Sequence, residues 1–340
     1  MRLGVEAALV GDELVLGDVE VGDGRILGVG LRRSGRGIAI PGLIDLQVNG
    51  FAGVDFLDAA ADDFARAGQA LAQAGVTAFM PTFVTSPKER LVAALEELAG
   101  ADVPGILGAH LEGPFVSPAR LGAHSAAARR DPDLGLLKRL LVAGPVRLVT
   151  LAPELPRAHS LIHALRERGI TASFGHTDAT AEEASAAFEL GVRTVTHIFN
   201  AMRPFSHRDP GIVGVALARD DVIIQAILDG LHLSPETEVL LWRATRRRLA
   251  VVSDHAAVPG GRLEDGTLAG STAGLLECVR RLHALGAPLP EAVGAATTLP
   301  ARILGDSDLG RLDVGFPADI VVLGDDLGLE RVLMGGRDVV

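Results

Sequence analysis

From residue 43 onward, short apolar runs of strand length alternate with segments in which apolar residues recur at helical spacing. Strands are expected at 43–48, 76–84, 106–112, 146–153, 170–176, 192–199, 222–228 and 249–253. Helices are expected at 61–74, 86–99, 133–143, 157–168, 181–190, from 234, at 272–285 and at 289–304. Eight strand–helix alternations in about 260 residues are typical of an α/β fold, the (β/α)8 TIM barrel.

Both ends of the chain have a different pattern. Residues 13–16, 18–21 and 25–29 alternate apolar and polar side chains, and turns containing glycine and aspartate separate them. The tail from residue 310 returns to the same short alternation. We therefore expect a small β-sandwich domain built from residues 1–42 and 306–340, beside a barrel domain at 43–305.

The composition is that of a soluble protein and fits the cytoplasm. Hydrophobic residues make up 48% of the 340 residues, enough for a large core, yet no apolar run reaches the length of a membrane span. The N-terminus lacks the pattern of a secretory signal. The single cysteine, Cys278, fits a reducing compartment. A net charge of −11, with no basic run longer than residues 246–248, argues against a nucleic-acid partner.

Polar residues follow four of the predicted strands at their carboxyl ends. These residues are Glu112, His176, His197 and Asp254. The carboxyl ends of barrel strands lie on one face and form the active site there, so these side chains are expected to meet. One carboxylate and two imidazoles form a ligand set for Zn²⁺ or Fe²⁺ with an open position for water. A single histidine of this kind is more often a hydrogen-bonded core residue, and the shared position of all three favours one divalent metal.

Asp254 is the best candidate for a general acid and base, because a carboxylate opposite the metal can take a proton from water and pass it to a leaving amine. The alternative is a carboxylate that only accepts hydrogen bonds from nearby backbone. His110 is expected to pack beside the metal ligands rather than to bind metal, and His255 is left without a role.

Gln47 and Asn49 end the first barrel strand as two inward amides. Amides are weaker ligands than the His-x-His pair that builds a second metal site in many hydrolase barrels. The two lysines, Lys88 and Lys138, lie on predicted helices, so neither is placed to bridge two metals. A single metal is the simpler interpretation, with Gln47 and Asn49 kept as a possible second site.

Several loop residues could bind an anionic substrate. His124 lies in the long segment after the third strand, Arg208 follows the sixth strand and His232 follows the seventh. Arginine and histidine commonly bind phosphate groups. Arg208 could instead be a surface residue paired with Asp209. The chain has neither a Walker loop nor a Rossmann glycine pattern after a strand.

Several motifs together resemble the N-acetylglucosamine-6-phosphate deacetylase family of the amidohydrolase superfamily. They are PGLIDLQVNG at 41–50, HLEGP at 110–114, GHTDAT at 175–180, THIFNAM at 196–202, DGLH at 229–232, SD at 253–254, LAGS at 268–271, GRL at 310–312 and GFPADI at 315–320. The similarity runs essentially from end to end, and the combination of HLEGP with THxxNAM is specific to this family.

The resemblance implies a role for each matching residue. Glu112, His176 and His197 would hold the metal, and Asp254 would transfer protons. Contacts to the sugar phosphate would come from Ala123, His124, Asn200, Ala201, Arg208, Asp229, His232, Leu268, Ala269 and Gly270. The phosphate contact can come from a partner subunit in such enzymes, so a homodimer is implied. Two features depart from the family pattern: the segment between Asp254 and Leu268 is shorter than in many relatives, and His255 stands where a small residue is expected.

The expected reaction is hydrolysis of the acetamide of N-acetylglucosamine 6-phosphate to glucosamine 6-phosphate and acetate. The alternatives are deacetylation of a related amino-sugar phosphate, such as the galactosamine epimer, and an inactive barrel that binds amino sugars. Cyclic-amide hydrolysis, as in dihydroorotases, is disfavoured by the absence of His-x-His and of a strand-end lysine.

Overall fold

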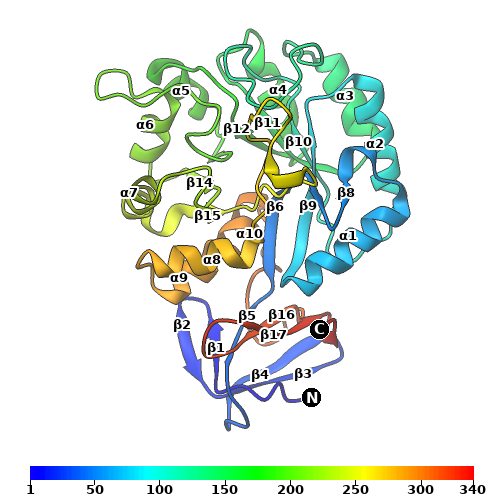
Figure 1. The fold of residues 1–340 in the computed structure, drawn as a ribbon, viewed down its shortest axis with the longest axis vertical. Coiled ribbons are helices and arrows are strands. Elements are labelled where there is room, and N and C mark those ends of the chain that lie inside the picture. The colour runs from blue at the N-terminus through cyan, green and yellow to red at the C-terminus, as the bar shows by residue number, and fades with distance from the viewer.

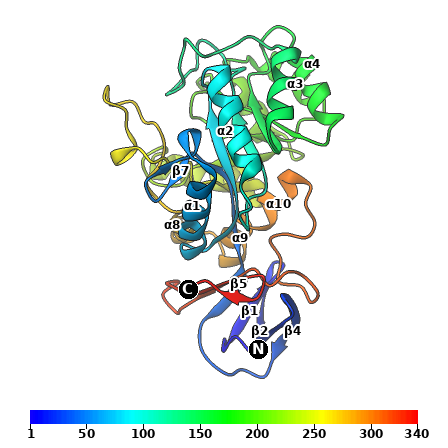
Figure 2. The same cartoon turned by 90° about the vertical axis from the view of Figure 1, so that its right-hand side faces the viewer.

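The computed structural model describes residues 1–340, apart from the side chain of Pro259. A barrel with surrounding helices forms the larger part of the molecule, and a smaller β region that contains both termini lies at one end of it (Figures 1 and 2).

Eight parallel strands form the barrel sheet, and each neighbours the next in sequence order. They are β6 (Leu43–Val48), β9 (Val76–Val84), β10 (Ala109–Glu112), β11 (Val146–Leu151), β12 (Thr171–Phe174), β13 (Thr194–Val195), β14 (Ile223–Ala226) and β15 (Leu249–Val251). The prediction of a (β/α)8 barrel is confirmed, because sequential parallel strands joined by helical crossovers form the observed sheet.

The first and last strands meet through a few backbone hydrogen bonds at the carboxyl end of the barrel. The Asp254 amide donates to Gln47 O at 2.9 Å, and the Asn49 amide donates to His255 O at 2.8 Å. At the opposite end, the Val251 and Ile44 amides donate to the carbonyls of Ala295 and Ala296. The barrel is therefore nearly closed, with a short turn inserted between β6 and β15 at its amino-terminal end.

Ten helices surround the strands (Figure 1). They are α1 (Ala61–Gln73), α2 (Lys88–Gly100), α3 (Leu134–Ala143), α4 (Ala158–Arg166), α5 (Ala181–Phe188), α6 (Gly211–Ala218), α7 (Pro235–Thr245), α8 (Leu275–Ala284), α9 (Leu289–Gly294) and α10 (Thr298–Leu304). Thr180 caps α5 by accepting a hydrogen bond from the Glu183 amide, and Ser234 caps α7 in the same way from Thr237.

Two helical features differ from the sequence prediction. Helix α6 was not expected, because its sequence GIVGVALA is rich in glycine and valine, which lower helix propensity. The helix expected at 289–304 is two helices, α9 and α10, with a break at Thr297 (φ −134°, ψ −81°). The break lies at the turn whose carbonyls, from Ala295 and Ala296, bond to β15 and β6.

Aromatic side chains connect the helical layer to the barrel. Phe56 stacks on Phe64 and on Phe79 with ring centroids 5.4 and 6.0 Å apart, and all three are fully buried. Burial of a phenylalanine contributes about 1.5–3 kcal/mol, so these contacts fix α1 against β9.

The smaller β region contains a six-stranded sheet in the order β18-β17-β16-β5-β1-β2 and a separate hairpin, β3–β4. The strands are β1 (Ala7–Val10), β2 (Glu13–Leu16), β3 (Asp18–Gly22), β4 (Arg25–Leu31), β5 (Ile38–Pro41), β16 (Ile320–Leu323), β17 (Leu329–Met334) and β18 (Arg337–Asp338). Because β5 pairs with β1 on one side and with β16 on the other, the two ends of the chain share one sheet, as the sequence predicts.

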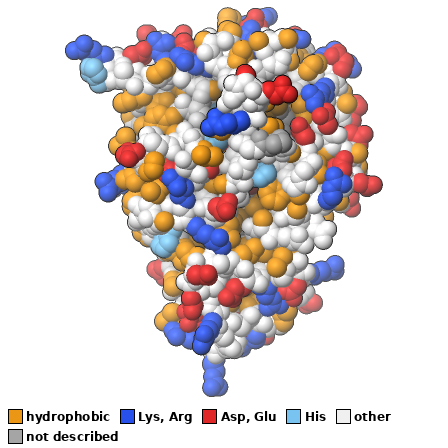
Figure 3. All heavy atoms as spheres, viewed as in Figure 1, with side chains coloured by type: hydrophobic (Ala, Val, Ile, Leu, Met, Phe, Trp, Pro, Cys, Tyr) orange, Lys and Arg blue, Asp and Glu red, His pale blue; other side chains and the backbone are white. Residues whose placement is uncertain are grey.

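Two surface observations bear on the partners of the protein. Within the described residues, no helix is both long and apolar enough to cross a membrane. On the face shown in Figure 3, acidic and basic side chains are interspersed. That distribution lacks the continuous basic stripe of a nucleic-acid surface.

Candidate active site

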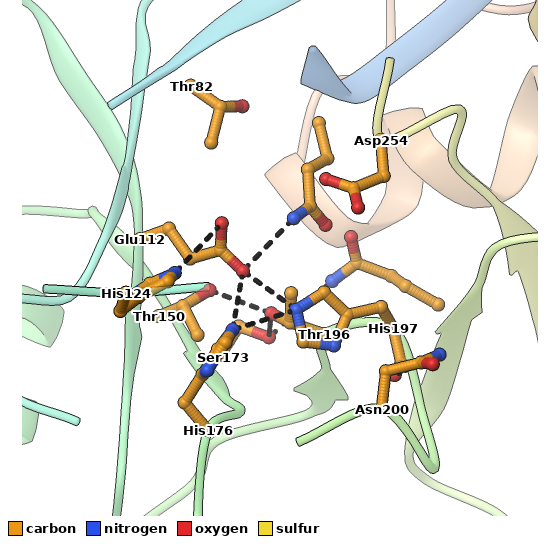
Figure 4. Close-up of polar contacts among 12 residues, drawn as sticks. Thr82, Glu112, His124, Thr150, Ser173, His176, Thr196, His197, Asn200 and Asp254 are labelled. Atoms are coloured by element: carbon orange, nitrogen blue, oxygen red, sulfur yellow. Dashed lines mark hydrogen bonds and ion pairs between the residues drawn. The ribbon is translucent and has the colours of Figure 1, made fainter. Parts of the chain in front are cut away.

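The three predicted metal ligands converge at the carboxyl end of the barrel (Figure 4). Glu112 Oε1 lies 3.0 Å from His176 Nε2 and 2.7 Å from His197 Nε2, and the two imidazole nitrogens are 3.1 Å apart. All three side chains are buried. The strands end before two of these residues: β12 stops at Phe174 and β13 at Val195, so His176 and His197 lie in the turns that follow, with φ of +49° and +30°.

The hydrogen bonding of His176 shows why a cation fits this site. His176 Nδ1 lies 3.1 Å from the Arg120 carbonyl and can only donate to it, so Nε2 of the neutral ring carries a lone pair. That lone pair faces the Glu112 carboxylate and the nitrogen of His197. With His197 Nε2 also unprotonated, the three atoms would repel one another unless a cation bound them, and their N,N,O chemistry suits a divalent metal.

The electrostatics of Glu112 agree with this arrangement. Burial alone would raise the pKa of Glu112, but the neighbouring imidazoles of His124, His176 and His197 outweigh it and hold that pKa well below its ordinary value. Burial, reinforced by the neighbouring His124, lowers the pKa of His176. The carboxylate is therefore ionised and the His176 ring neutral near pH 7, as metal ligands must be.

Gln47 and Asn49 donate to the two acidic residues of the site. Gln47 Nε2 donates to Glu112 Oε1 at 3.1 Å, and Asn49 Nδ2 donates to Asp254 Oδ1 at 2.8 Å. The amide oxygens of both residues are buried without a hydrogen-bond partner among the described residues. Their observed contacts orient carboxylates, and a ligand role for either amide stays a prediction.

Asp254 faces the metal ligands from the turn after β15 (Figure 4). Burial, reinforced by the negative charge of Glu112, raises the pKa of Asp254 to about 8. A raised pKa at a cleft carboxylate is typical of a residue that exchanges protons during catalysis. A cation between the two carboxylates would oppose this increase.

In protein stripped of metal with a chelator, the free energy of unfolding should fall as pH rises from 6.5 to 8. Over this range folded Asp254, with a pKa of about 8, retains a proton that an unfolded aspartate, with a pKa near 3.9, has lost. Below about pH 6.5, histidines with lowered pKa values such as His110 act in the opposite direction. Urea unfolding at several pH values measures this slope. Asp254→Asn should flatten it, and a flat wild-type profile would contradict the raised pKa.

His124 lies beside the metal ligands, stacked on His176 with ring centroids 4.0 Å apart. Its Nδ1 is 2.7 Å from Thr85 Oγ1, and its Nε2 is 3.7 Å from Glu112 Oε2. When Thr85 donates to Nδ1, the proton of His124 resides on Nε2, where it can be donated to a substrate oxygen. No role was predicted for Thr85, although Thr85 follows the apolar residues of β9 just as Glu112 follows those of β10.

His232 is oriented by Asp229. The Asp229 carboxylate accepts from His232 Nδ1 at 2.8 Å and from the backbone amides of Leu231 and His232. His232 Nε2 therefore points toward Asp254, with 3.8 Å to its Oδ2. Glu238 is fully buried and forms an ion pair with Arg281. It also accepts a hydrogen bond from the Gly230 amide, which stabilises the turn that contains Asp229 and His232.

A cavity of about 430 Å³ is lined by Glu112, His176, His197 and Asp254. Most of the predicted substrate contacts line it: Ala123, His124, Asn200, Ala201, His232, Leu268, Ala269 and Gly270. Asp229 does not line it and acts on His232 instead. Arg208 does not line it either; it is exposed in the segment leading into α6, which extends away from the barrel rim (Figure 1). The alternative pairing with Asp209 is not observed, since Asp209 pairs with Arg203.

Other cavity residues had no predicted role. Asp55, Leu57, Ser86 and Arg90 line one side, and Ile227, the 256–258 segment and Leu263 complete the wall. Asp55 belongs to a short hairpin, β7 (Gly50–Phe51) and β8 (Val54–Asp55), that the sequence analysis did not foresee. His255, also unassigned, packs on Phe51 and lies 2.8 Å from the Gly50 carbonyl through Nδ1, so it holds this hairpin beside the cavity.

His110, which was predicted to pack beside the metal ligands without binding metal, is fully buried. Its Nε2 lies 2.8 Å from Thr150 Oγ1, and its Nδ1 lies 3.1 Å from the Leu46 carbonyl. Thr150 Oγ1 in turn hydrogen-bonds to Thr196 Oγ1 at 2.7 Å, so a chain of hydrogen bonds crosses the barrel interior. Burial lowers the pKa of His110 to about 4, which leaves the ring neutral.

Known proteins resemble this chain over most of its length. The model of the amidohydrolase family matches residues 38–339. Human N-acetylglucosamine-6-phosphate deacetylase is 38% identical over 346 residues, covering 90% of this chain and 84% of the human protein. The N-acetylgalactosamine-6-phosphate deacetylase of Escherichia coli O157:H7 is 32% identical, covering 87% and 86% of the two chains.

Solved structures show the same similarity in three dimensions. A mutant of N-acetyl-D-glucosamine-6-phosphate deacetylase from Mycobacterium smegmatis, in complex with N-acetyl-D-glucosamine 6-phosphate, superposes with a TM-score of 0.95 at 34% identity. The match covers 100% of this chain and 99% of that one.

Proposed function

The chain belongs to the amidohydrolase family, and we propose that it hydrolyses the acetamide of N-acetyl-D-glucosamine 6-phosphate to D-glucosamine 6-phosphate and acetate. The observation that carries the proposal is the convergence of Glu112, His176 and His197 opposite Asp254 at the floor of one cavity. Relatives at 34–39% identity over most of the chain are deacetylases of this substrate. An inactive amino-sugar-binding barrel is not favoured, because Glu112, His176, His197 and Asp254 all line one cavity.

Glu112, His176 and His197 would hold a divalent cation, which would supply Lewis-acid chemistry by polarising the amide carbonyl and lowering the pKa of water. We propose Zn²⁺ as this cation, since a carboxylate and two imidazoles are a common zinc ligand set, while Fe²⁺ accepts the same ligands. The order in which metals restore activity to chelator-treated protein tests the identity.

The neighbouring side chains complete the chemistry. Asp254 accepts a proton from the attacking water and afterwards donates it to the leaving amine, so that glucosamine departs in a neutral form. His124 donates from Nε2 to the amide oxygen as negative charge develops there, a contribution worth about 10²–10³ in rate. Asn49 holds Asp254 in position through its 2.8 Å hydrogen bond.

The substrate phosphate needs a cationic partner, and we propose Arg208 with His232 for this role. Within one chain Arg208 lies outside the cavity, on the exposed segment before α6. The segment could therefore reach the cavity of a second copy, which would make the enzyme a homodimer whose phosphate site is shared between subunits.

The single cysteine, Cys278, is buried and unpaired, which fits the proposed location in the cytoplasm.

Replacing Arg208 with methionine should raise KM for the phosphorylated sugar by about 10–100-fold, because one charge-assisted phosphate contact is lost. The turnover of unphosphorylated N-acetylglucosamine should not change. Steady-state kinetics on both sugars measures this difference. Arg243→Met, an exposed arginine on α7, is a control that should behave as wild type. Equal losses on both sugars would show that Arg208 does not bind phosphate.

Mixing two defective variants tests whether the site is shared. Arg208→Met and Asp254→Asn chains, dissociated and reassociated together, should regain about a quarter of wild-type activity at low substrate concentration, because half of the dimers then contain one intact site of two. No recovery, in a mixture shown to exchange subunits, would place Arg208 with its own chain.

Release of acetate from N-acetylglucosamine 6-phosphate by purified, metal-loaded protein tests the proposed reaction. The galactosamine epimer, the substrate named for the E. coli relative, should react more slowly. No acetate from either sugar, with one metal bound per chain, would refute the proposal.

A further inference from the structure

Four charged side chains form a continuous series of ion pairs among loops at the carboxyl end of the barrel. Arg120 Nε donates to Asp178 Oδ1 at 2.7 Å, and Arg203 Nη1 donates to Asp178 Oδ2 at 3.3 Å. Arg203 then donates from Nε to Asp209 Oδ2 at 2.9 Å and from Nη2 to the same oxygen at 2.7 Å. We call this series the rim chain.

The rim chain joins three separate loops. Arg120 comes from the segment between β10 and α3, Asp178 from the turn between β12 and α5, and Arg203 with Asp209 from the segment before α6. The Arg120, Asp178 and Arg203 side chains are only 28–30% exposed, so solvent screens these pairs less than ordinary surface pairs. Each carboxylate oxygen of Asp178 receives a different guanidinium, which fixes the relative positions of Arg120 and Arg203.

One end of the rim chain lies at the metal site. The backbone carbonyl of Arg120 accepts from His176 Nδ1, and the Asp178 amide donates to Glu154 Oε1 at 2.7 Å. Thr177 Oγ1, in the same turn as His176, donates to Glu154 Oε2 at 2.6 Å. The rim chain is therefore joined to the turn that carries His176 through the Arg120 carbonyl and through Asp178.

The other end closes the exposed segment that carries Arg208. Arg203 and Asp209 bracket residues 204–208, and their ion pair joins the two ends of this short loop. Inside it, the Ser206 amide donates to the Asp209 carbonyl at 3.0 Å, and the Asp209 amide donates to Ser206 Oγ at 3.1 Å. Arg208 thus lies one residue from a tethered position, although its own guanidinium has no acidic partner within 4 Å among the described residues.

We infer that Arg203 is a positioning residue that tethers the Arg208 loop to the barrel of its own chain through the rim chain, and so sets the affinity for the substrate phosphate at whichever cavity Arg208 serves. The inference rests on the proposed phosphate contact of Arg208. A preorganised loop loses less conformational freedom when it binds an anion, so the tether favours the phosphorylated substrate without contacting it.

Replacing Arg203 with methionine should raise KM for N-acetylglucosamine 6-phosphate about fivefold, with kcat and the turnover of the unphosphorylated sugar unchanged. Arg203→Lys retains the charge but contacts one carboxylate at a time, so it should lie between wild type and methionine. Asp209→Asn should resemble Arg203→Met, and the double variant should be little worse than either, because both remove one interaction.

Arg219→Met is the matched control. Arg219 lies at the other end of α6, is 24% exposed and pairs with both Glu189 and Asp221, yet it does not touch the Arg208 loop. A similar KM increase in this control, or equal losses on both sugars in Arg203→Met, would overturn the inference, because either result indicates general destabilisation.

Limited trypsin digestion tests the tether without reference to activity. The bond after Arg208 should be cut several-fold faster in Arg203→Met than in wild type or Arg219→Met, because cleavage follows the population of the open loop. An unchanged cleavage rate would overturn the inference even if KM changed. If wild-type protein released no acetate, the proposed function would fail, and the cleavage rates would still decide whether Arg203 restrains the loop.

Discussion

Asp254→Asn should lower kcat on N-acetylglucosamine 6-phosphate by about 10²–10⁴, the range expected for loss of a general acid and base. Asparagine has nearly the same shape and retains an oxygen for the Asn49 amide, which lies 2.8 Å from Asp254 Oδ1. It cannot accept a proton from water or return one to the amine. Steady-state kinetics with parallel metal analysis measures the effect, and the metal content should remain at the wild-type level because Asp254 is outside the Glu112–His176–His197 cluster.

The pH profile of this variant adds a second measurement. The acid limb of kcat, which reports ionisation of the base, should disappear in Asp254→Asn. Asp55→Asn is a suitable control, because Asp55 lines the same cavity but accepts from the Leu57 amide, away from the metal ligands. It should remain close to wild type. An Asp254→Asn enzyme that keeps wild-type turnover and pH profile would exclude Asp254 as the proton-transfer group.

The barrel could be predicted from sequence because its signals are local and repeated. Apolar runs bounded by turn residues appear eight times, and the strands begin within a few residues of the predicted positions. Helix α6 was not predicted, because its glycines and valines have low helix propensity. Packing against α5 stabilises the helix in spite of this sequence. The break between α9 and α10 depends on hydrogen bonds to β6 and β15, which no local pattern reveals. The domain boundaries at residues 42 and 306 remain a prediction.

The predictability of the site follows the same division. Glu112, His176, His197 and Asp254 could be brought together because barrel topology places the ends of distant strands on one face. The backbone conformations of His176, His197 and Asp254 could not be predicted from the sequence. The strand pattern does not indicate the positive φ values that turn these side chains toward Glu112. Thr85 contacts His124, 39 residues away, and Asp178 of the rim chain contacts arginines 58 and 25 residues away in other loops, which spacing along the chain does not indicate.

Glu112→Gln should abolish metal binding and lower kcat by at least about 10⁴, because the Lewis-acid contribution to the barrier amounts to several kcal/mol. Glu112 is the only anion among the three ligands, and its Oε1 is the atom on which both histidine nitrogens converge. Glutamine has the same length and can accept from Gln47, but it provides no negative charge to a cation. The measured metal content should fall from one ion per chain in the wild type to nearly none in the variant. Added zinc should raise the melting temperature of the wild type only.

The metal-free variant should be at least as stable as metal-free wild type, which separates loss of binding from loss of folding. In the wild type without metal, the buried Glu112 charge faces histidine lone pairs and raises the pKa of Asp254. Replacing Glu112 by glutamine removes the repulsion with the histidine lone pairs and allows the pKa of Asp254 to fall. Glu154→Gln, a change of the same type in the next strand–helix loop, should keep its metal, because Glu154 contacts Thr177 and the Asp178 amide. A Glu112→Gln protein that retains one metal per chain and near-normal turnover would mean that the cation binds elsewhere.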